Sequence, residues 1–178
     1  MVQACSGRRR REEISSAMNL YITGEKVDIR PIGEENMDAV RQWYDEKDIY
    51  GFATGMRNVE EAMAVSPCSF FSGIYTKDGF IIGLVAGELR KTNETVLWLR
   101  TFLIDAAWQR KGFGTHSFCL LRNYAAKRFN AKKIYLSVPK KNAAGINFWN
   151  KMGMTCVKKL DGRKPENDGE VLILEKVL

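Results

Sequence analysis

Hydrophobic and polar residues alternate over Val27–Ile32, and the spacing changes directly afterwards. Strict alternation predicts a half-buried strand. Beyond it, Met37, Val40 and Tyr44 follow the i, i+3, i+7 spacing of one helical face, so we place a helix here. Its predicted range is Glu34–Asp45.

The next segment contains a capping signal and two glycines. Asn58 and Glu61 have the spacing of an N-cap pair, which predicts a short helix at Val59–Val65. A Ser-Pro pair follows and ends this helix. We expect the preceding segment, Ile49–Arg57, to be a loop because it carries both glycines, and such loops often line binding sites.

Three consecutive strands, joined by tight turns, come next. They are predicted at Ser69–Thr76, Phe80–Arg90 and Thr95–Ile104. The second strand is long enough to hold a β-bulge. In the third strand, we expect Leu97, Leu99 and Leu103 to share one face because they occupy odd-numbered positions.

The second half of the chain alternates helices with strands. Helices are predicted at Thr115–Asn130 and Ala143–Met152, and strands at Lys132–Val138, Thr155–Leu160 and Val171–Val177. The crossover through the first of these helices makes its two flanking strands parallel. The predicted fold class is α/β, in the sense of α+β: a mixed, mostly antiparallel central sheet with helices on both faces.

Composition favours one cytoplasmic domain without metal or disulfide. The chain is 45% hydrophobic and 28% charged, which allows a core of its own. Its four cysteines are scattered and it has a single histidine, so no zinc pattern is present and no metal is expected. The longest uncharged apolar run, Phe80–Gly87, falls far short of the ~20 residues of a membrane span, so we expect no membrane contact.

The first 25 residues form the expected boundary of this domain. We interpret residues 1–25 as an N-terminal extension, poorly ordered or helical, and residues 26–178 as the domain. Arg8–Arg11 is a basic run in the extension, but Glu12 and Glu13 follow directly and offset half of its positive charge. We therefore favour a solvated tail over a nucleic-acid contact.

A glycine-bearing turn connects the predicted strand that ends at Ile104 to the long helix that follows. Its sequence is Gln109-Arg110-Lys111-Gly112-Phe113-Gly114-Thr115. Glycines let the backbone approach a ligand closely, and the first N–H groups of a helix have no internal partner. Together with the helix dipole these groups favour an anion. The turn therefore predicts a site for a pyrophosphate.

The charge distribution supports a small polyanion at this turn. From Gln109 to the end, the chain has 15 Lys and Arg and 5 Asp and Glu, a net charge of +10, whereas the residues before Gln109 have a net charge of −3. The basic residues fall on several elements, and no nucleic-acid-binding motif is present, so no nucleic-acid partner is expected. The P-loop pattern of nucleotide hydrolases is also missing. The acidic first half fits a cationic amine partner.

The turn and a second segment resemble the GCN5-related N-acetyltransferase (GNAT) superfamily over about Val27 to Val177. The family's cofactor motif appears as Gln109-x-x-Gly112-x-Gly114. The second segment is Asn142 after a strand, then the pair Phe148-Trp149 and the run Lys151-Met152-Gly153-Met154. The resemblance implies a GNAT-like fold with acetyl-CoA as co-substrate.

The resemblance also implies an activity and a set of cofactor-binding residues. The activity is acyl-CoA-dependent N-acyl transfer, with an acetyl group passing directly from acetyl-CoA to a primary amine of a small molecule or peptide. The implied cofactor-binding residues are Phe102, Leu103, Ile104, Gln109, Arg110, Lys111, Gly112, Phe113, Gly114, Thr115, Asn142, Phe148, Trp149 and Lys151.

Two departures from the family pattern affect the proton-transfer groups. Many relatives have a tyrosine acid where this chain has Trp149, and some have a glutamate base where it has Trp98. Indole donates a hydrogen bond but does not release its proton at neutral pH. We choose Glu88 as the candidate base and Tyr135 as the candidate acid.

Other candidates stay open at this point: Asp105 as a base, and Tyr44, Tyr50, Tyr75 or Tyr124 as an acid. A non-catalytic domain that binds acyl-CoA as a sensor or scaffold is the alternative function. A homodimer also stays open.

Overall fold

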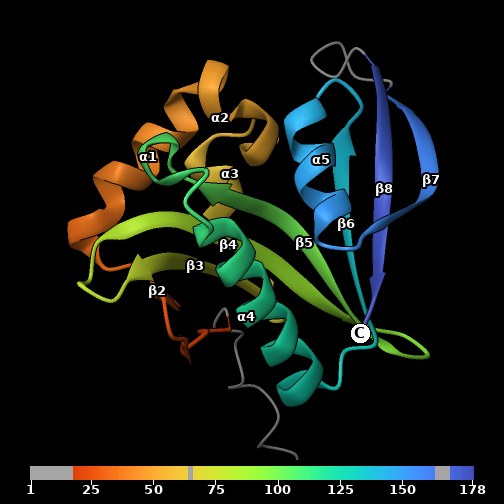
Figure 1. The fold of residues 1–178 in the computed structure, drawn as a ribbon, viewed down its shortest axis with the longest axis horizontal. Helices are drawn as coiled ribbons and strands as arrows, with labels where there is room; N and C mark the ends of the chain where they lie inside the picture. The colour runs from red at the N-terminus through yellow and green to blue at the C-terminus, as the bar shows by residue number, and fades with distance from the viewer. Residues whose placement is uncertain (1–17, 64–65, 163–168) are drawn as a thin grey trace, which may run out of the picture.

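An eight-stranded sheet runs through the protein in the order β1-β2-β3-β4-β5-β6-β8-β7 (Figure 1). The computed structural model describes residues 18–63, 66–162 and 169–178. The strands are β1 (Ile22–Thr23), β2 (Val27–Pro31), β3 (Ser69–Thr76), β4 (Ile81–Lys91), β5 (Thr95–Ile104), β6 (Lys133–Pro139), β7 (Thr155–Gly162) and β8 (Gly169–Val177). Strands β5 and β6 are parallel, and the other neighbours are antiparallel.

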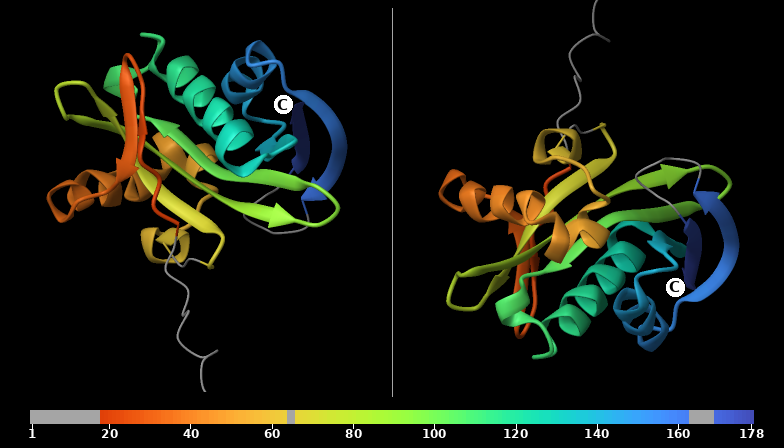
Figure 2. Two further views of the ribbon diagram at one scale, coloured as in Figure 1. Left: turned by 90° about the horizontal axis from the view of Figure 1, so that it is seen from below. Right: turned by 90° about the horizontal axis from the view of Figure 1, so that it is seen from above.

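Helices cover both faces of the sheet (Figure 2). One face carries α1 (Met37–Asp45), α2 (Lys47–Thr54) and α3 (Val59–Met63), and the other carries α4 (Phe113–Phe129) and α5 (Ala143–Lys151). Two 3-10 turns, η1 (Glu34–Asn36) and η2 (Ala106–Trp108), precede α1 and follow β5. The predicted fold class, a mixed and mostly antiparallel sheet with helices on both faces, is confirmed.

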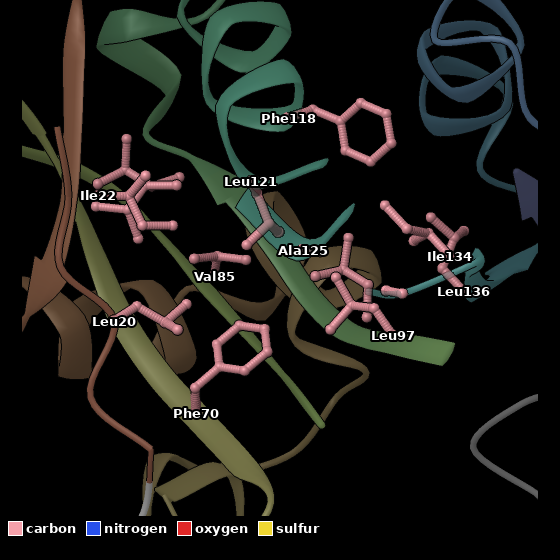
Figure 3. Close-up of a cluster of buried hydrophobic side chains, with 14 of the residues drawn as sticks. Leu20, Ile22, Phe70, Val85, Leu97, Phe118, Leu121, Ala125, Ile134 and Leu136 are labelled. Carbon is pink, nitrogen blue, oxygen red and sulfur yellow. The ribbon is translucent and has the colours of Figure 1, made fainter. Parts of the chain in front are cut away.

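Two hydrophobic clusters hold these layers together. The larger one lies between the sheet and α4, where Phe118 and Leu121 pack against sheet residues such as Leu97 and Ile134 (Figure 3). The smaller one lies under α1–α3 and includes Leu103. Removing this apolar surface from water is the main favourable contribution to folding.

A β-bulge in β5 corrects the predicted pattern of that strand. The consecutive β4 residues Ala86 and Gly87 pair with Thr101 and Leu99, so Arg100 is an extra residue without a partner on β4. A bulge of this kind shifts the alternation of faces by one residue. Leu103 therefore packs under α1–α3, whereas Leu97 and Leu99 pack under α4, and the prediction of a shared face was wrong.

The segment Ile49–Arg57, predicted to be a loop, lies mostly in helix α2. Gly51 belongs to the helix, where a Cβ would lie 2.4 Å from the Met56 sulfur, so a close contact explains this glycine. Only Gly55, with φ +66°, ends the helix. Two glycines with different roles produced the wrong prediction. The N-cap of α3 is confirmed, since Glu61 N donates to Asn58 Oδ1 at 2.7 Å.

The expected boundary at residue 26 lies too late in the chain. Leu20 and Ile22 are buried in the larger cluster, and Ile22–Thr23 pairs with β2. Met18 N also donates to Ser69 O at 2.8 Å. Residues 18–25 are therefore neither loose nor helical, because their alternating apolar side chains complete the edge of the sheet. Residues 1–17 of the predicted extension lie outside the described residues.

Candidate functional site

The glycine turn is a tightly hydrogen-bonded connection from β5 to α4. Gln109 Nε2 donates to Ile104 O at 2.8 Å, which ties the turn to the end of the strand. Arg110 and Gly112 both have left-handed backbone conformations, with φ of 59° and 85°. Glycine adopts this conformation without strain, so Gly112 lets the chain reverse direction directly before the helix.

The first amide groups of α4 point out of this turn. His116 N donates to Gly112 O at 3.1 Å, so the N–H groups of Phe113, Gly114 and Thr115 precede the first helical hydrogen bond. Gly112, as the N-cap, supplies no side-chain partner. The arrangement is a backbone site for an anion.

Arg110 and Lys111 flank the site and are exposed. Lys111 Nζ donates to Ala107 O at 2.8 Å, which holds its charge beside the turn. In the described ranges Arg110 takes part in no salt bridge.

Gly114 brings α4 close to α5. A Cβ at Gly114 would lie 3.3 Å from Phe148 and 3.6 Å from an Ile104 side-chain carbon. Contacts this short leave little room for any side chain at position 114. The second glycine of the motif therefore serves packing of the helix beside the turn, whereas the first serves backbone conformation.

The two parallel strands separate directly beside the turn. Val96–Leu99 of β5 pairs with Lys133–Leu136 of β6, and the pairing stops there although β5 continues to Ile104 and β6 to Pro139. Beyond this pairing, the facing main-chain groups of both strands are free of ladder hydrogen bonds to one another. An extended ligand chain placed between them would find donors and acceptors on both sides.

An aromatic cluster lies between the separated part of β5 and α5. Phe102 stacks on Phe148 with ring centroids 5.8 Å apart and meets Trp149 edge-on at 5.4 Å. Phe118 of α4 packs edge-on against both Phe102 and Trp149. Three residues predicted to bind the cofactor thus contact one another, and Trp149 is only 8% exposed, so packing explains much of its role.

Asn142 caps helix α5. Its Oδ1 accepts a hydrogen bond from Gly145 N at 2.9 Å, and a Cβ at Gly145 would lie 2.3 Å from the Asn142 amide. The structure thus gives Asn142 the helix-fixing role. The exposed Lys151 lies in the last turn of the same helix, and its contact with the cofactor stays a prediction.

Replacing Asn142 with Ala is expected to destabilise the protein by about 1 kcal/mol because the cap of α5 is lost. Asn150→Ala is the matched control. Asn150 is exposed on the same helix, where alanine is the better helix former. Urea unfolding measures both, and an equal loss in the two variants would contradict the capping role.

The two candidate catalytic residues lie on either side of Trp98. Glu88 pairs with Trp98 across β4–β5, and Tyr135 pairs with it across β5–β6 and stacks on its ring at 5.8 Å. Glu88 accepts from Arg90 Nε at 2.6 Å. Tyr135 donates to Glu175, and this hydrogen bond raises the pKa of the Tyr135 hydroxyl. The structure brings both onto one sheet face, within the paired part of β5 and β6, and their catalytic roles stay predictions.

Two further candidates have structural partners near the turn. Asp105 accepts from Ala107 N at 2.8 Å and from Trp43 Nε1 at 2.7 Å, so its carboxylate joins α1 to the end of β5. The Tyr50 hydroxyl accepts from Ala106 N at 3.0 Å. Burial raises the pKa of Tyr50, which keeps the phenol protonated at neutral pH.

The remaining tyrosine candidates lie on other elements. Tyr75 donates to Pro31 O at 3.3 Å, and burial raises its pKa as well. Tyr124 packs edge-on against Phe129 near the end of α4.

Sequence reasoning missed Arg100, the bulge residue next to the point where β5 and β6 separate. Nothing in the alternation of Thr95–Ile104 indicates a bulge, and an arginine between apolar residues looks like an ordinary exposed position. Two of its guanidinium nitrogens are nevertheless buried.

Comparison with known proteins establishes the family. A family model described as the acetyltransferase (GNAT) family matches residues 37–154, which is more than half of the chain. The chain therefore belongs to the acetyltransferase (GNAT) family, and the resemblance inferred from the glycine motif is confirmed.

Among curated relatives, the spermine/spermidine N(1)-acetyltransferase of Bacillus subtilis (strain 168) is 32% identical over 65 residues. The matched segment covers 36% of this chain and 43% of that relative, so the chain spans less than half of the relative's length.

Solved structures of low identity share the fold. A GNAT-family acetyltransferase from Bacillus anthracis superposes with a TM-score of 0.73 at 13% identity, over 89% of this chain and 98% of that one. The spermidine N-acetyltransferase of Vibrio cholerae, solved with CoA and spermine, gives a TM-score of 0.72 at 14% identity, over 85% and 95% of the two chains.

In the part of the chain that the structure describes, no three or more His, Cys, Asp or Glu side chains gather as a metal site. No helix of these ranges is long and apolar enough to cross a bilayer.

Proposed function

We propose that this protein is an acyl-CoA-dependent N-acyltransferase that moves an acetyl group from acetyl-CoA directly to a primary amine of a small molecule or peptide. The observation that carries the proposal is the group of amides at the start of α4 that have no hydrogen-bond partner among the described residues, directly beside the point where β5 and β6 separate. The amides suit a pyrophosphate, and the free strand edges suit the amide-bearing arm of coenzyme A.

The residues assigned to the cofactor fall into three groups. Gln109–Thr115 would hold the phosphates through backbone N–H groups and the two cationic side chains. Phe102–Ile104 would pair with the pantetheine arm, and Phe148 and Trp149 would form one wall of its path. Asn142 would act indirectly by fixing α5.

The chemistry is a direct acyl transfer. Acetyl-CoA supplies the thioester, and the amine nitrogen forms a bond to the carbonyl carbon as the C–S bond breaks. Coenzyme A leaves as the thiolate, and the proton that the amine loses passes through solvent to this sulfur, which gives the acetamide and the free thiol. The backbone N–H near Leu103 would stabilise the negative charge that develops on the carbonyl oxygen, an effect worth about 2.7–4 kcal/mol for one such donor. Positioning the two reactants would supply much of the remaining acceleration.

A panel of amines tests the activity. The full chain is mixed with acetyl-CoA and, in turn, spermidine, amino acids and short peptides, and thiol release is followed together with product mass. Spermidine belongs in the panel because the curated relative is named for polyamine acetylation. We expect thiol release with at least one amine and a product heavier by one acetyl group.

The amine panel also distinguishes a catalyst from a protein that only binds acyl-CoA. Acetyl-CoA binding without thiol release for any amine would support the non-catalytic acyl-CoA-binding alternative. The hydroxyl of Tyr135, the candidate acid, donates to Glu175, and this engagement is the observation that favours the alternative.

A further inference from the structure

Polar side chains without partners lie on the α1–α3 face of the sheet, next to the point where β5 and β6 separate. Within the described ranges, Nε and Nη2 of Arg100 and the hydroxyl of Tyr44 are buried and have no hydrogen-bond partner. Nearly all buried polar groups have one, and an unpaired group costs free energy. These three atoms therefore leave hydrogen-bonding groups unused on this face of the sheet.

The bulge brings Arg100 and Thr101 to Tyr44. Tyr44 packs against Phe71 with ring centroids 6.4 Å apart. Phe71, Ala86 and Thr101 lie in one row across β3, β4 and β5, and Arg100 is the bulge residue directly before Thr101. Burial raises the pKa of the Tyr44 hydroxyl.

In the described part of the chain Arg100 forms no salt bridge, so no carboxylate there balances its charge. Two carboxylates on nearby strand positions are engaged elsewhere. Glu88 accepts from Arg90, and Asp105 accepts from Ala107 N and Trp43. Buried charges are normally paired, and the half-buried guanidinium of Arg100 lacks an anion among these residues.

The position of Arg100 relates its charge to the proposed transfer. Arg100 directly follows Leu99, the last β5 residue that pairs with β6. Phe102, at the start of the proposed pantetheine edge, lies two residues further, about 7 Å along a strand. Nε and Nη2 of Arg100 are buried, whereas the residue as a whole is partly exposed at this edge.

We infer that Arg100 binds an anionic group of the acceptor, so that the acceptor is an amine with a carboxylate or phosphate a short carbon chain away from its nitrogen. This inference rests on the proposed function. A planar guanidinium pairs with either anion through two parallel hydrogen bonds, and the Tyr44 hydroxyl adds another donor. A diamine would instead bring its second positive charge toward Arg100, which is unfavourable.

Four short amines that differ mainly in their second group test the inference: γ-aminobutyrate with a carboxylate, 3-aminopropyl phosphate with a phosphate, neutral 4-amino-1-butanol and putrescine with a second cation. Their kcat/KM values are compared by thiol release from acetyl-CoA. We expect the better anionic amine to exceed the neutral one by about 10- to 100-fold, the range of a charge-assisted pair, and putrescine to rank last. The ranking of the first two tells which anion the subsite takes.

Arg100→Met tests the residue itself, because methionine keeps an apolar stem and removes the guanidinium. We expect the advantage of the anionic amines to disappear, while kcat/KM for 4-amino-1-butanol changes by less than about threefold. Arg122→Met is the matched control, since Arg122 is also half-buried but lies on α4, on the other face of the sheet. If Arg100→Met fails to fold, Arg100→Gln gives the same comparison, because glutamine removes the charge and keeps a polar side chain.

Calorimetric titration of the CoA-bound protein with the same four amines separates the two ideas. Binding of an anionic amine to the unmodified protein and not to Arg100→Met would support the subsite even if no amine is acetylated, in which case the proposed function fails alone. Transfer that prefers 4-amino-1-butanol or putrescine, or that ignores Arg100→Met, would overturn the subsite and leave acyl transfer intact. Failure of both anionic amines to bind would overturn it as well.

Discussion

Replacing Gly112 with Asp is expected to abolish the stabilisation of this protein by acetyl-CoA. At ~100 times its dissociation constant, a ligand that binds only the folded state stabilises it by about 2.7 kcal/mol, which for a chain of this size raises Tm by about 5–10 °C. The aspartate would put a negative charge and a side chain beside the amides of Phe113, Gly114 and Thr115. Differential scanning fluorimetry with and without acetyl-CoA measures the shift.

Gly79→Asp is the matched control for backbone strain. Gly79 has φ +87° in the turn between β3 and β4, and Gly112 has φ +85°. A Cβ at Gly79 would meet nothing within 4 Å, and one at Gly112 would meet only His116 at 3.8 Å. Asp tolerates the left-handed conformation better than most residues, so both variants should fold. A normal acetyl-CoA shift in Gly112→Asp, or its loss in Gly79→Asp, would contradict the assignment of the turn.

Replacing Phe118 with Ala is expected to destabilise the protein by about 3–5 kcal/mol. Phe118 has no exposed surface and packs edge-on against Phe102 and Trp149, so truncation leaves a cavity where α4, β5 and α5 meet. Close-packed interiors relax only in part around such a cavity. Urea unfolding monitored by circular dichroism gives the free energy of unfolding.

Phe80→Ala is the control for this substitution. Phe80 is 62% exposed beside the β3–β4 turn, so its loss should change stability by no more than about 0.5 kcal/mol. A small effect of Phe118→Ala would mean that the aromatic cluster contributes little to the contact between α4 and α5.

Local signals in the sequence were sufficient for most elements. The Asn58–Glu61 spacing places the start of α3, and the glycine turn places the start of α4 close to Gly112. Asn142 caps α5, the helix that it precedes. These features depend on hydrogen bonds between residues close in the chain, and short-range spacing therefore predicts them.

What the sequence did not predict depends on contacts between distant segments. The helical state of Gly51 is a local exception, because a glycine inside α2 and Gly55 at its end look alike in the sequence. The bulge at Arg100 depends on the register with β4, and the alternation within β5 conceals it. The same limit applies to the catalytic assignment, because the Tyr135–Glu175 contact joins residues 40 positions apart.

The short parallel pairing between β5 and β6 has a mechanical consequence. Strands β6, β8 and β7 form a half-sheet. In the described ranges, main-chain bonds between β5 and this half-sheet run from Lys132 N, which donates to Thr95 O, through the pairing of Val96–Leu99 with Lys133–Leu136. Such a short junction lets the two half-sheets move relative to one another. A ligand that forms hydrogen bonds with the free edges of both β5 and β6 would extend the main-chain connection between them. Binding would then reduce the motion of the smaller half-sheet as a whole.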